Sequence, residues 1–167
     1  MQTVNESNSD FVIGVVGGMG SYATLSFFKR YLIKFPAEKE WERPRIIIDN
    51  RCTMPSRVRA LLYNEKYSKV IDEITDSIES LVSVGGKNTK VVLACNTSHV
   101  FLNQILIKKP ELKKNIIHLI EETGNYFYKK NIKEVYLIAT EGTIESKIYQ
   151  ETLAKYEIKV ESPESEI

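Results

Sequence analysis

The fold of this protein is indicated most clearly by one stretch of its sequence, Val91-Val92-Leu93-Ala94-Cys95-Asn96-Thr97-Ser98-His99. It begins as a short apolar run, typical of a buried strand in a parallel sheet, and it ends at a cysteine followed by small polar residues. A helical pattern follows directly, with apolar residues at positions 100, 101 and 105. Open α/β sheets place functional groups at the carboxyl ends of their strands, and the backbone N–H groups of a following helix favour an anion such as a thiolate. Cys95 is therefore the first candidate for a catalytic residue.

Composition limits the classes of protein to consider. The 167-residue chain is long enough to bury a substantial core, with 43% hydrophobic and 27% charged residues. A net charge of +1 argues against a nucleic-acid partner, no apolar run approaches the roughly 20 residues of a membrane span, and the polar first ten residues do not form a secretory signal. Two cysteines, Cys52 and Cys95, are too few for a disulfide framework and too far apart for a metal pair. We therefore expect a cytoplasmic protein with reduced thiols, no metal site and no membrane partner.

Strands and helices alternate along the chain, which predicts an α/β fold with a parallel sheet built from βαβ units. The expected strands are short apolar runs, and the expected helices repeat apolar residues every three or four positions. We place strands near residues 11–16, 45–49, 91–95, 116–119, 134–140 and 158–160, and helices near 24–35, 67–82, 100–107, 121–130 and 144–156. The pattern restarts near Pro110. We therefore divide the chain into a first lobe, residues 1–111, and a partial second lobe, residues 112–167.

A glycine-rich turn, Gly17-Gly18-Met19-Gly20-Ser21, follows the first predicted strand. Such a turn lets the backbone approach another group closely or adopt a positive φ. The same region fits the G-x-G-x-x-A form of the dinucleotide fingerprint, and Asp49 ends the second strand, where a ribose-binding acid lies in that motif. Asp49 follows the last glycine by more than the usual ~20 residues. The sequence therefore allows two interpretations of this segment, a tight turn that binds no ligand and a nucleotide-binding loop.

Polar residues also follow the other strand ends. Asn50 can contact a ligand or form a turn, and Arg57 can clamp a carboxylate or lie on the surface. The run Asn96-Thr97-Ser98 exceeds what one helix cap needs, which favours binding, whereas His99 can be an acid–base group or a packing residue. Thr140-Glu141-Gly142-Thr143 repeats the strand-to-turn pattern in the second lobe. The two turns face each other if the sheet ends converge on a cleft.

Together these motifs resemble those of the aspartate/glutamate racemase family, most closely its aspartate racemase branch. The matching segments are Gly17-Gly18-Met19-Gly20 with Ala23-Thr24, Pro55-Ser56-Arg57, Ala94-Cys95-Asn96-Thr97-Ser98-His99, and Ala139-Thr140-Glu141-Gly142-Thr143. They extend over nearly the whole chain, and the Cys-Asn-Thr-Ser-His string is the most specific. The resemblance implies a flavodoxin-like, pseudo-symmetric fold with an acidic amino acid bound between two lobes.

The resemblance also implies a mechanism without a cofactor. In this family one cysteine thiolate removes the Cα proton of the amino acid, and a second cysteine on the opposite face returns a proton. Such a reaction requires the substrate carboxylate to be neutralised, because a Cα–H is a very weak acid. On this model the residues with a role are Cys95 as one base, Asn96, Thr97 and Ser98 at the α-carboxylate, Met19 and Gly20 lining the pocket, Arg57 at the side-chain carboxylate, and Asn50 as a further polar contact.

The sequence departs from the family pattern in two places. Ser21 stands where the family motif has proline, and the printed sequence contains neither the family's Gly-Cys-Thr segment with the second cysteine nor its downstream lysine and closing helix. Cys52 does not replace that cysteine by motif, because it lies in the same loop as Arg57. We therefore expect an aspartate or glutamate racemase with weak or absent activity. The alternatives are a non-catalytic amino-acid-binding or interaction module and, in third place, an NAD-binding oxidoreductase. An incomplete second lobe would expose apolar surface, which favours a homodimer.

Overall fold

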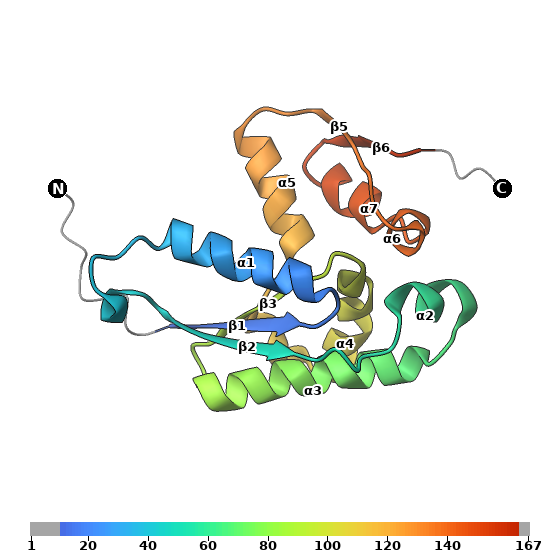
Figure 1. Cartoon of the computed structure of the whole chain (residues 1–167). Coiled ribbons are helices and arrows are strands. Elements are labelled where there is room, and N and C mark those ends of the chain that lie inside the picture. Colours follow the sequence, from blue (N-terminus) through green and yellow to red (C-terminus); the bar gives the residue numbers. More distant parts are fainter. Residues whose placement is uncertain (1–10, 164–167) are drawn as a thin grey trace.

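The main sheet consists of four parallel strands in the order β2-β1-β3-β4. They are β1 (Val12–Gly17), β2 (Arg45–Asn50), β3 (Lys90–Leu93) and β4 (Ile116–Ile117) (Figure 1). The computed structural model describes residues 11–163, so the polar first ten residues, for which no secretory signal is predicted, and the last four residues lie outside the described part. The parallel pairing confirms the α/β fold expected from the alternating sequence pattern.

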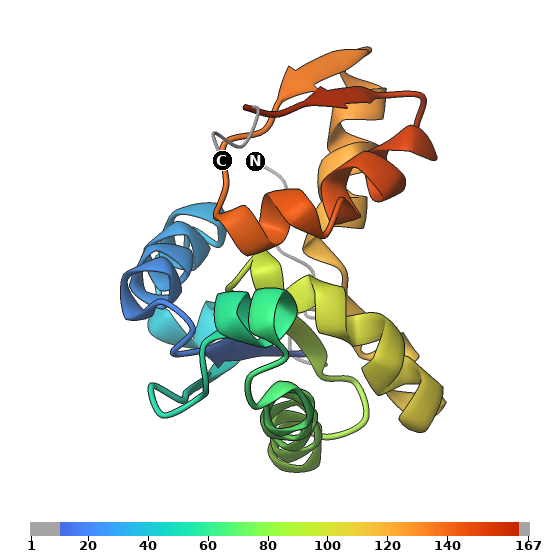
Figure 2. The same cartoon turned by 90° about the vertical axis from the view of Figure 1, so that its right-hand side faces the viewer.

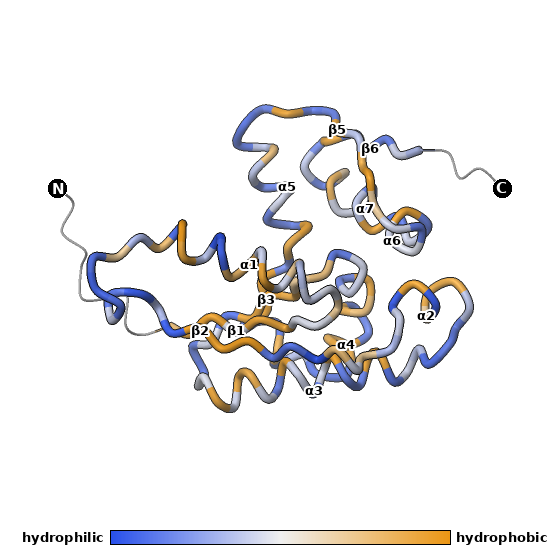
Figure 3. Tube along the Cα trace, viewed as in Figure 1, coloured by the Kyte–Doolittle hydropathy of each residue, from blue (hydrophilic) through white to orange (hydrophobic). Residues whose placement is uncertain are grey.

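Helices cover both faces of this sheet. Helix α1 (Ser21–Lys34) lies on one side and α3 (Tyr67–Gly85) on the other, joined there by α4 (Leu102–Lys108) (Figure 1). Because side chains alternate along a strand, Val15 packs in the cluster of Tyr31 on α1, while Val16 packs in the cluster of Ile74 on α3. The hydrophobic colour of β1 and β2 in Figure 3 shows why these strands need cover on both faces.

A second, smaller sheet follows in the chain. Strands β5 (Glu134–Tyr136) and β6 (Lys159–Glu161) pair in parallel, and helices α5 (Leu119–Lys129), α6 (Glu141–Glu145) and α7 (Ile148–Ala154) accompany them (Figure 2). The core of this lobe is formed by Ile120, Leu153 and Ile158. A two-stranded sheet with so small a core makes the second lobe a partial one.

Three local predictions differ from the structure. β4 pairs with β3, so it belongs to the first sheet, although the division after residue 111 assigned it to the second lobe. The single helix expected over residues 144–156 is broken into α6 and α7, because Lys147 adopts a left-handed φ of 55°. The loop expected to contain Arg57 instead ends at Ser56, whose side chain accepts the Arg59 N–H and starts α2 (Arg57–Tyr63).

The remaining helical turns are short 3₁₀ segments: η2 (Glu40–Glu42), η3 (Thr97–Phe101) and η4 (Pro110–Lys114). The helical pattern after Cys95 therefore starts with η3, and the α-helix begins only at Leu102. None of the helices within residues 11–163 combines the length and apolarity that crossing a membrane requires.

Candidate active site

A pocket of about 410 Å³ lies between the two lobes, at the carboxyl ends of the β1 and β3 strands. The first lobe contributes side chains from the glycine turn, from the start of α2 and from the segment after β3, and the second lobe contributes the segment after β5 and residues of α6 and α7. The lining residues are Met19, Ser56, Arg57, Val58, Cys95, Asn96, Thr97, Leu137, Ile138, Ala139, Thr140, Thr143 and Tyr149. The two turns singled out in the sequence do therefore face each other.

The backbone at Cys95 is held by the residues that follow it. The Cys95 carbonyl accepts a hydrogen bond from the Ser98 hydroxyl at 2.7 Å and contacts His99 Nδ1 at 2.9 Å. One residue earlier, the Ala94 N–H donates to the Val16 carbonyl at 3.0 Å, which continues the β1–β3 pairing beyond the end of the strand. The half-buried Cys95 thiol is thus carried on a backbone fixed from both sides.

His99 is a structural residue in this arrangement. Its Nε2 accepts the Leu119 N–H at 3.2 Å, so the proton of the neutral ring is on Nδ1 and is donated to the Cys95 carbonyl. The side chain is buried, and burial, with the nearby His118 as a second cause, lowers the pKa of His99 to about 4. His99 therefore connects the strand end to the start of α5 and does not line the pocket. Of the two roles that the sequence left open for His99, an acid–base group or a packing residue, the contacts favour the second.

Thr97 belongs to a cluster of three hydroxyls that joins the lobes. Its Oγ1 lies 2.7 Å from Thr143 Oγ1 and 3.2 Å from Thr140 Oγ1, and the latter two are 3.1 Å apart. Next to it, the Asn96 Oδ1 accepts a hydrogen bond of 3.0 Å from the hydroxyl of Tyr149 on α7. The polar residues after Cys95 thus make the main polar contacts across the pocket.

Among the described residues that line the pocket, Arg57 alone carries a positive charge. Its guanidinium donates from Nη1 to the Pro55 carbonyl and from Nη2 to the Met19 carbonyl, both at 2.9 Å. The Nε–H is buried and has no acceptor among the residues that the structure describes. Since a guanidinium carries five N–H donors, further donors remain for a ligand beside these two contacts.

A comparison with protein families agrees with this geometry: residues 16–167 match the model of the Asp/Glu/Hydantoin racemase family. The chain belongs to this racemase family. A broad specificity amino-acid racemase of Bacillus subtilis, RacX, is 27% identical over 146 residues, which cover 85% of this chain and 60% of that protein. At 27% identity this relative is a distant one.

Solved structures of racemases share the fold. The aspartate racemase of Picrophilus torridus superposes with a TM-score of 0.79 at 28% identity, covering 92% of this chain and 62% of that chain. An aspartate racemase homologue of Pyrococcus horikoshii gives a TM-score of 0.71 at 20% identity, with 92% and 65% covered. The chain thus spans about three fifths of the length of these relatives.

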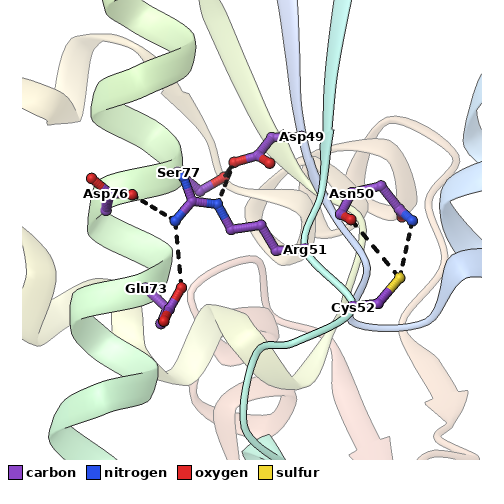
Figure 4. A network of polar contacts seen from close by, with 7 residues as sticks. All are labelled: Asp49, Asn50, Arg51, Cys52, Glu73, Asp76 and Ser77. Atoms are coloured by element: carbon purple, nitrogen blue, oxygen red, sulfur yellow. Dashed lines mark hydrogen bonds and ion pairs between the residues drawn. The ribbon is translucent and has the colours of Figure 1, made fainter.

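The glycine turn of this racemase-family chain is locked onto the loop after β2. Gly18 has a φ of 79°, and a Cβ there would overlap the backbone of Arg51. The Arg51 side chain is in turn held by Asp49 at 2.6 Å, Asp76 at 2.6 Å and Glu73 at 3.4 Å (Figure 4). The Ser77 hydroxyl also donates to Asp49, at 2.6 Å. These contacts account for Asp49 at the strand end without a ribose.

Three of the residues predicted as substrate contacts do not line the pocket. Ser98 is fully buried and holds the Cys95 backbone, and Gly20 is the exposed residue before α1. Asn50 is exposed, and its Nδ2 lies 3.2 Å from the Cys52 Sγ (Figure 4). Cys52 is exposed as well and is absent from the pocket lining. The pocket thus brings together Met19, Arg57, Cys95, Asn96 and Thr97 from the predicted set.

Sequence reasoning missed Tyr149. The apolar stripe of the predicted last helix ran through positions 144, 148, 152 and 156, and Tyr149 lies beside that stripe. No motif marked it, because its position depends on the break at Lys147, which starts α7 in a new direction. A left-handed lysine has no clear sequence signal.

Proposed function

We propose that this pocket binds an acidic amino acid, aspartate or glutamate, and that Cys95 transfers its Cα proton without a cofactor. One observation carries the proposal: a single pocket gathers the Cys95 thiol, the polar side chains of Asn96 and Thr97, and the cation of Arg57. These groups match the needs of an anionic substrate whose Cα proton must be removed.

The charges of the ligand suggest how it binds. The α-carboxylate is placed beside Asn96 and Thr97, next to the thiol, where hydrogen-bond donors stabilise the charge that develops when the Cα proton leaves. The second carboxylate is placed at Arg57, whose planar guanidinium suits a carboxylate. The apolar wall of Leu137, Ile138 and Ala139 faces the carbon chain.

The proposed reaction moves one proton and one electron pair. The Cys95 thiolate takes the Cα proton and becomes a thiol, and the electron pair of the broken C–H bond is delocalised onto the α-carboxylate. Return of a proton from the same thiol restores the original configuration, whereas return from the opposite face inverts it. Among the described residues that line the pocket, Cys95 is the single cysteine. For this chain alone we therefore propose that the Cα hydrogen is exchanged with solvent and that this exchange is faster than racemisation.

The same observation favours a second candidate function, a non-catalytic module that binds an amino acid. Without a second base the binding residues can persist while the reaction is lost. A cytoplasmic location and a homodimer stay predictions, and an NAD-dependent function finds no support in the paired Asp49.

The test follows the Cα hydrogen of L- and D-aspartate in D₂O by proton NMR, with the wild-type chain, Cys95→Ala and the control Cys52→Ala. We expect deuterium at Cα for the wild type and Cys52→Ala, and none for Cys95→Ala. If the wild type binds aspartate in calorimetry but exchanges nothing, the binding module is the better description. If it neither binds nor exchanges either acidic amino acid, both functions are wrong.

A further inference from the structure

The contact between Tyr149 and Asn96 has a consequence for ligand recognition. Asn96 directly follows Cys95, Tyr149 is the second residue of α7, and both line the pocket. The Tyr149 hydroxyl donates to the Asn96 Oδ1 at 3.0 Å, and the two residues come from different lobes. In this hydrogen bond the accepting end of the Asn96 amide points toward the second lobe.

A side-chain amide has an accepting end and a donating end, so its orientation decides what it recognises. With Oδ1 held by Tyr149, the Asn96 Nδ2 group carries two hydrogens, and nothing within residues 11–163 accepts either of them. Burial raises the pKa of Tyr149, which keeps the phenol protonated and therefore able to donate. The opposite amide orientation would present an acceptor to the ligand.

We propose that Tyr149 is a positioning residue that turns the Asn96 NH₂ group toward the ligand and so makes the pocket selective for a carboxylate beside Cys95. An oxygen of a carboxylate only accepts hydrogen bonds, so it needs a donor at this position. An amide at the same place on the ligand offers one accepting oxygen and no charge, so it gains less from the oriented NH₂ group. The orientation at Tyr149 thus favours the carboxylate over the uncharged analogue.

This inference rests on the proposed binding of an acidic amino acid. Removing the phenol hydroxyl gives up the one hydrogen bond that turns the Asn96 NH₂ donor toward the ligand, and a net hydrogen bond corresponds to about a 3- to 10-fold change in affinity. We therefore expect Tyr149→Phe to weaken L-aspartate binding by about that factor. Binding of L-isoasparagine, whose α-carboxylate is an amide, should change less, because the released Asn96 can turn its oxygen to the ligand.

The experiment is a double-mutant cycle by calorimetry with the wild type, Tyr149→Phe, Asn96→Ala and the double variant. The Tyr149→Phe effect on L-aspartate should vanish in the Asn96→Ala background, because the hydroxyl acts only through that amide. An unchanged affinity in Tyr149→Phe, or the same loss with and without Asn96, would overturn the proposal. The Tyr149→Phe variant should also discriminate less between L-aspartate and L-isoasparagine, which loss of a merely structural tyrosine would not cause.

A ligand-free measurement separates this inference from the proposed function. The Asn96 side-chain NH₂ signals in a ¹H–¹⁵N spectrum are identified by their disappearance in Asn96→Ala. They should shift in Tyr149→Phe, since the hydrogen bond at Oδ1 is lost. If the wild type binds no aspartate while these signals shift, the proposed ligand is wrong and the orienting contact stands. If the signals do not shift, the inference is wrong whatever the wild type binds.

Discussion

His99 makes the stability of this fold depend on pH. In the native state its pKa is about 4, against 6.5 for an unperturbed histidine, because the buried ring is desolvated and the neighbouring His118 lowers the pKa further. Above pH 6.5 the ring is neutral in both the folded and the unfolded state. Between pH 6.5 and about 4 the unfolded chain binds a proton that the native state does not, so stability is lost as the pH falls. The linkage relation gives a loss of about 2 kcal/mol at pH 5, a large part of a total of roughly 5–15 kcal/mol.

The assay is urea unfolding at pH 7.5 and pH 5, followed by circular dichroism, for the wild type and His99→Gln. Carboxylates titrate in both proteins, so the loss attributable to His99 is the difference between their pH dependences. His118→Gln is a companion variant and not an independent control, because His118 contributes to the lowered pKa of His99 and burial lowers its own pKa as well. Equal losses in wild type and His99→Gln would refute the reasoning. Should His99→Gln fail to fold, an imidazole ¹⁵N titration of the wild type decides: a midpoint near pH 6.5 for His99 is the refuting result.

Three further substitutions test how the pocket is built. Gly18→Ala should cost at least about 2 kcal/mol, because Gly18 has a positive φ and its new methyl would overlap the backbone of Arg51; chemical unfolding measures this. In a cycle of Thr97→Val and Thr143→Val, we expect a coupling of about 1 kcal/mol in unfolding free energy from their 2.7 Å contact, and additive effects would contradict that contact. Gly142→Ala should lower stability by about 1–2 kcal/mol, since its Cβ would meet the backbone of α2 at 3.2 Å; an unchanged melting temperature would show that α2 and α6 adjust freely.

The parallel sheet could be predicted because its signal is local. Buried central strands such as β1 and β3 must be apolar on both faces, so their sequences read as continuous runs, and α3 repeats apolar residues along one side. The strand β4 is predicted, but the division after residue 111 groups it with the second lobe. With two residues it carries no information about its partner, and only the pairing with β3 assigns it.

The site could be predicted less completely, because direction matters there more than residue type. Asn96, Thr97 and Ser98 are all small polar residues. In the tight η3 turn, however, the Ser98 hydroxyl points back to the Cys95 carbonyl, whereas Asn96 and Thr97 line the pocket. Arg57 was expected in a loop, while the structure makes it the first residue of α2, where Ser56 caps the helix. The Pro55-Ser56 pair before a helical pattern was the signal that could have shown this.

The hydroxyl cluster limits how the pocket can hold an anion. Thr97, Thr140 and Thr143 have three hydroxyl hydrogens and make three mutual contacts, so a closed ring uses every donor it has. A carboxylate that accepts from Thr97 therefore takes a hydrogen from one of these contacts, and ligand binding competes with the docking of the lobes. Asn96 and Arg57 escape this competition, because each keeps N–H donors that no described residue uses. They can therefore supply most of the affinity for an anion, while Thr97 chiefly fixes where the second lobe sits over Cys95.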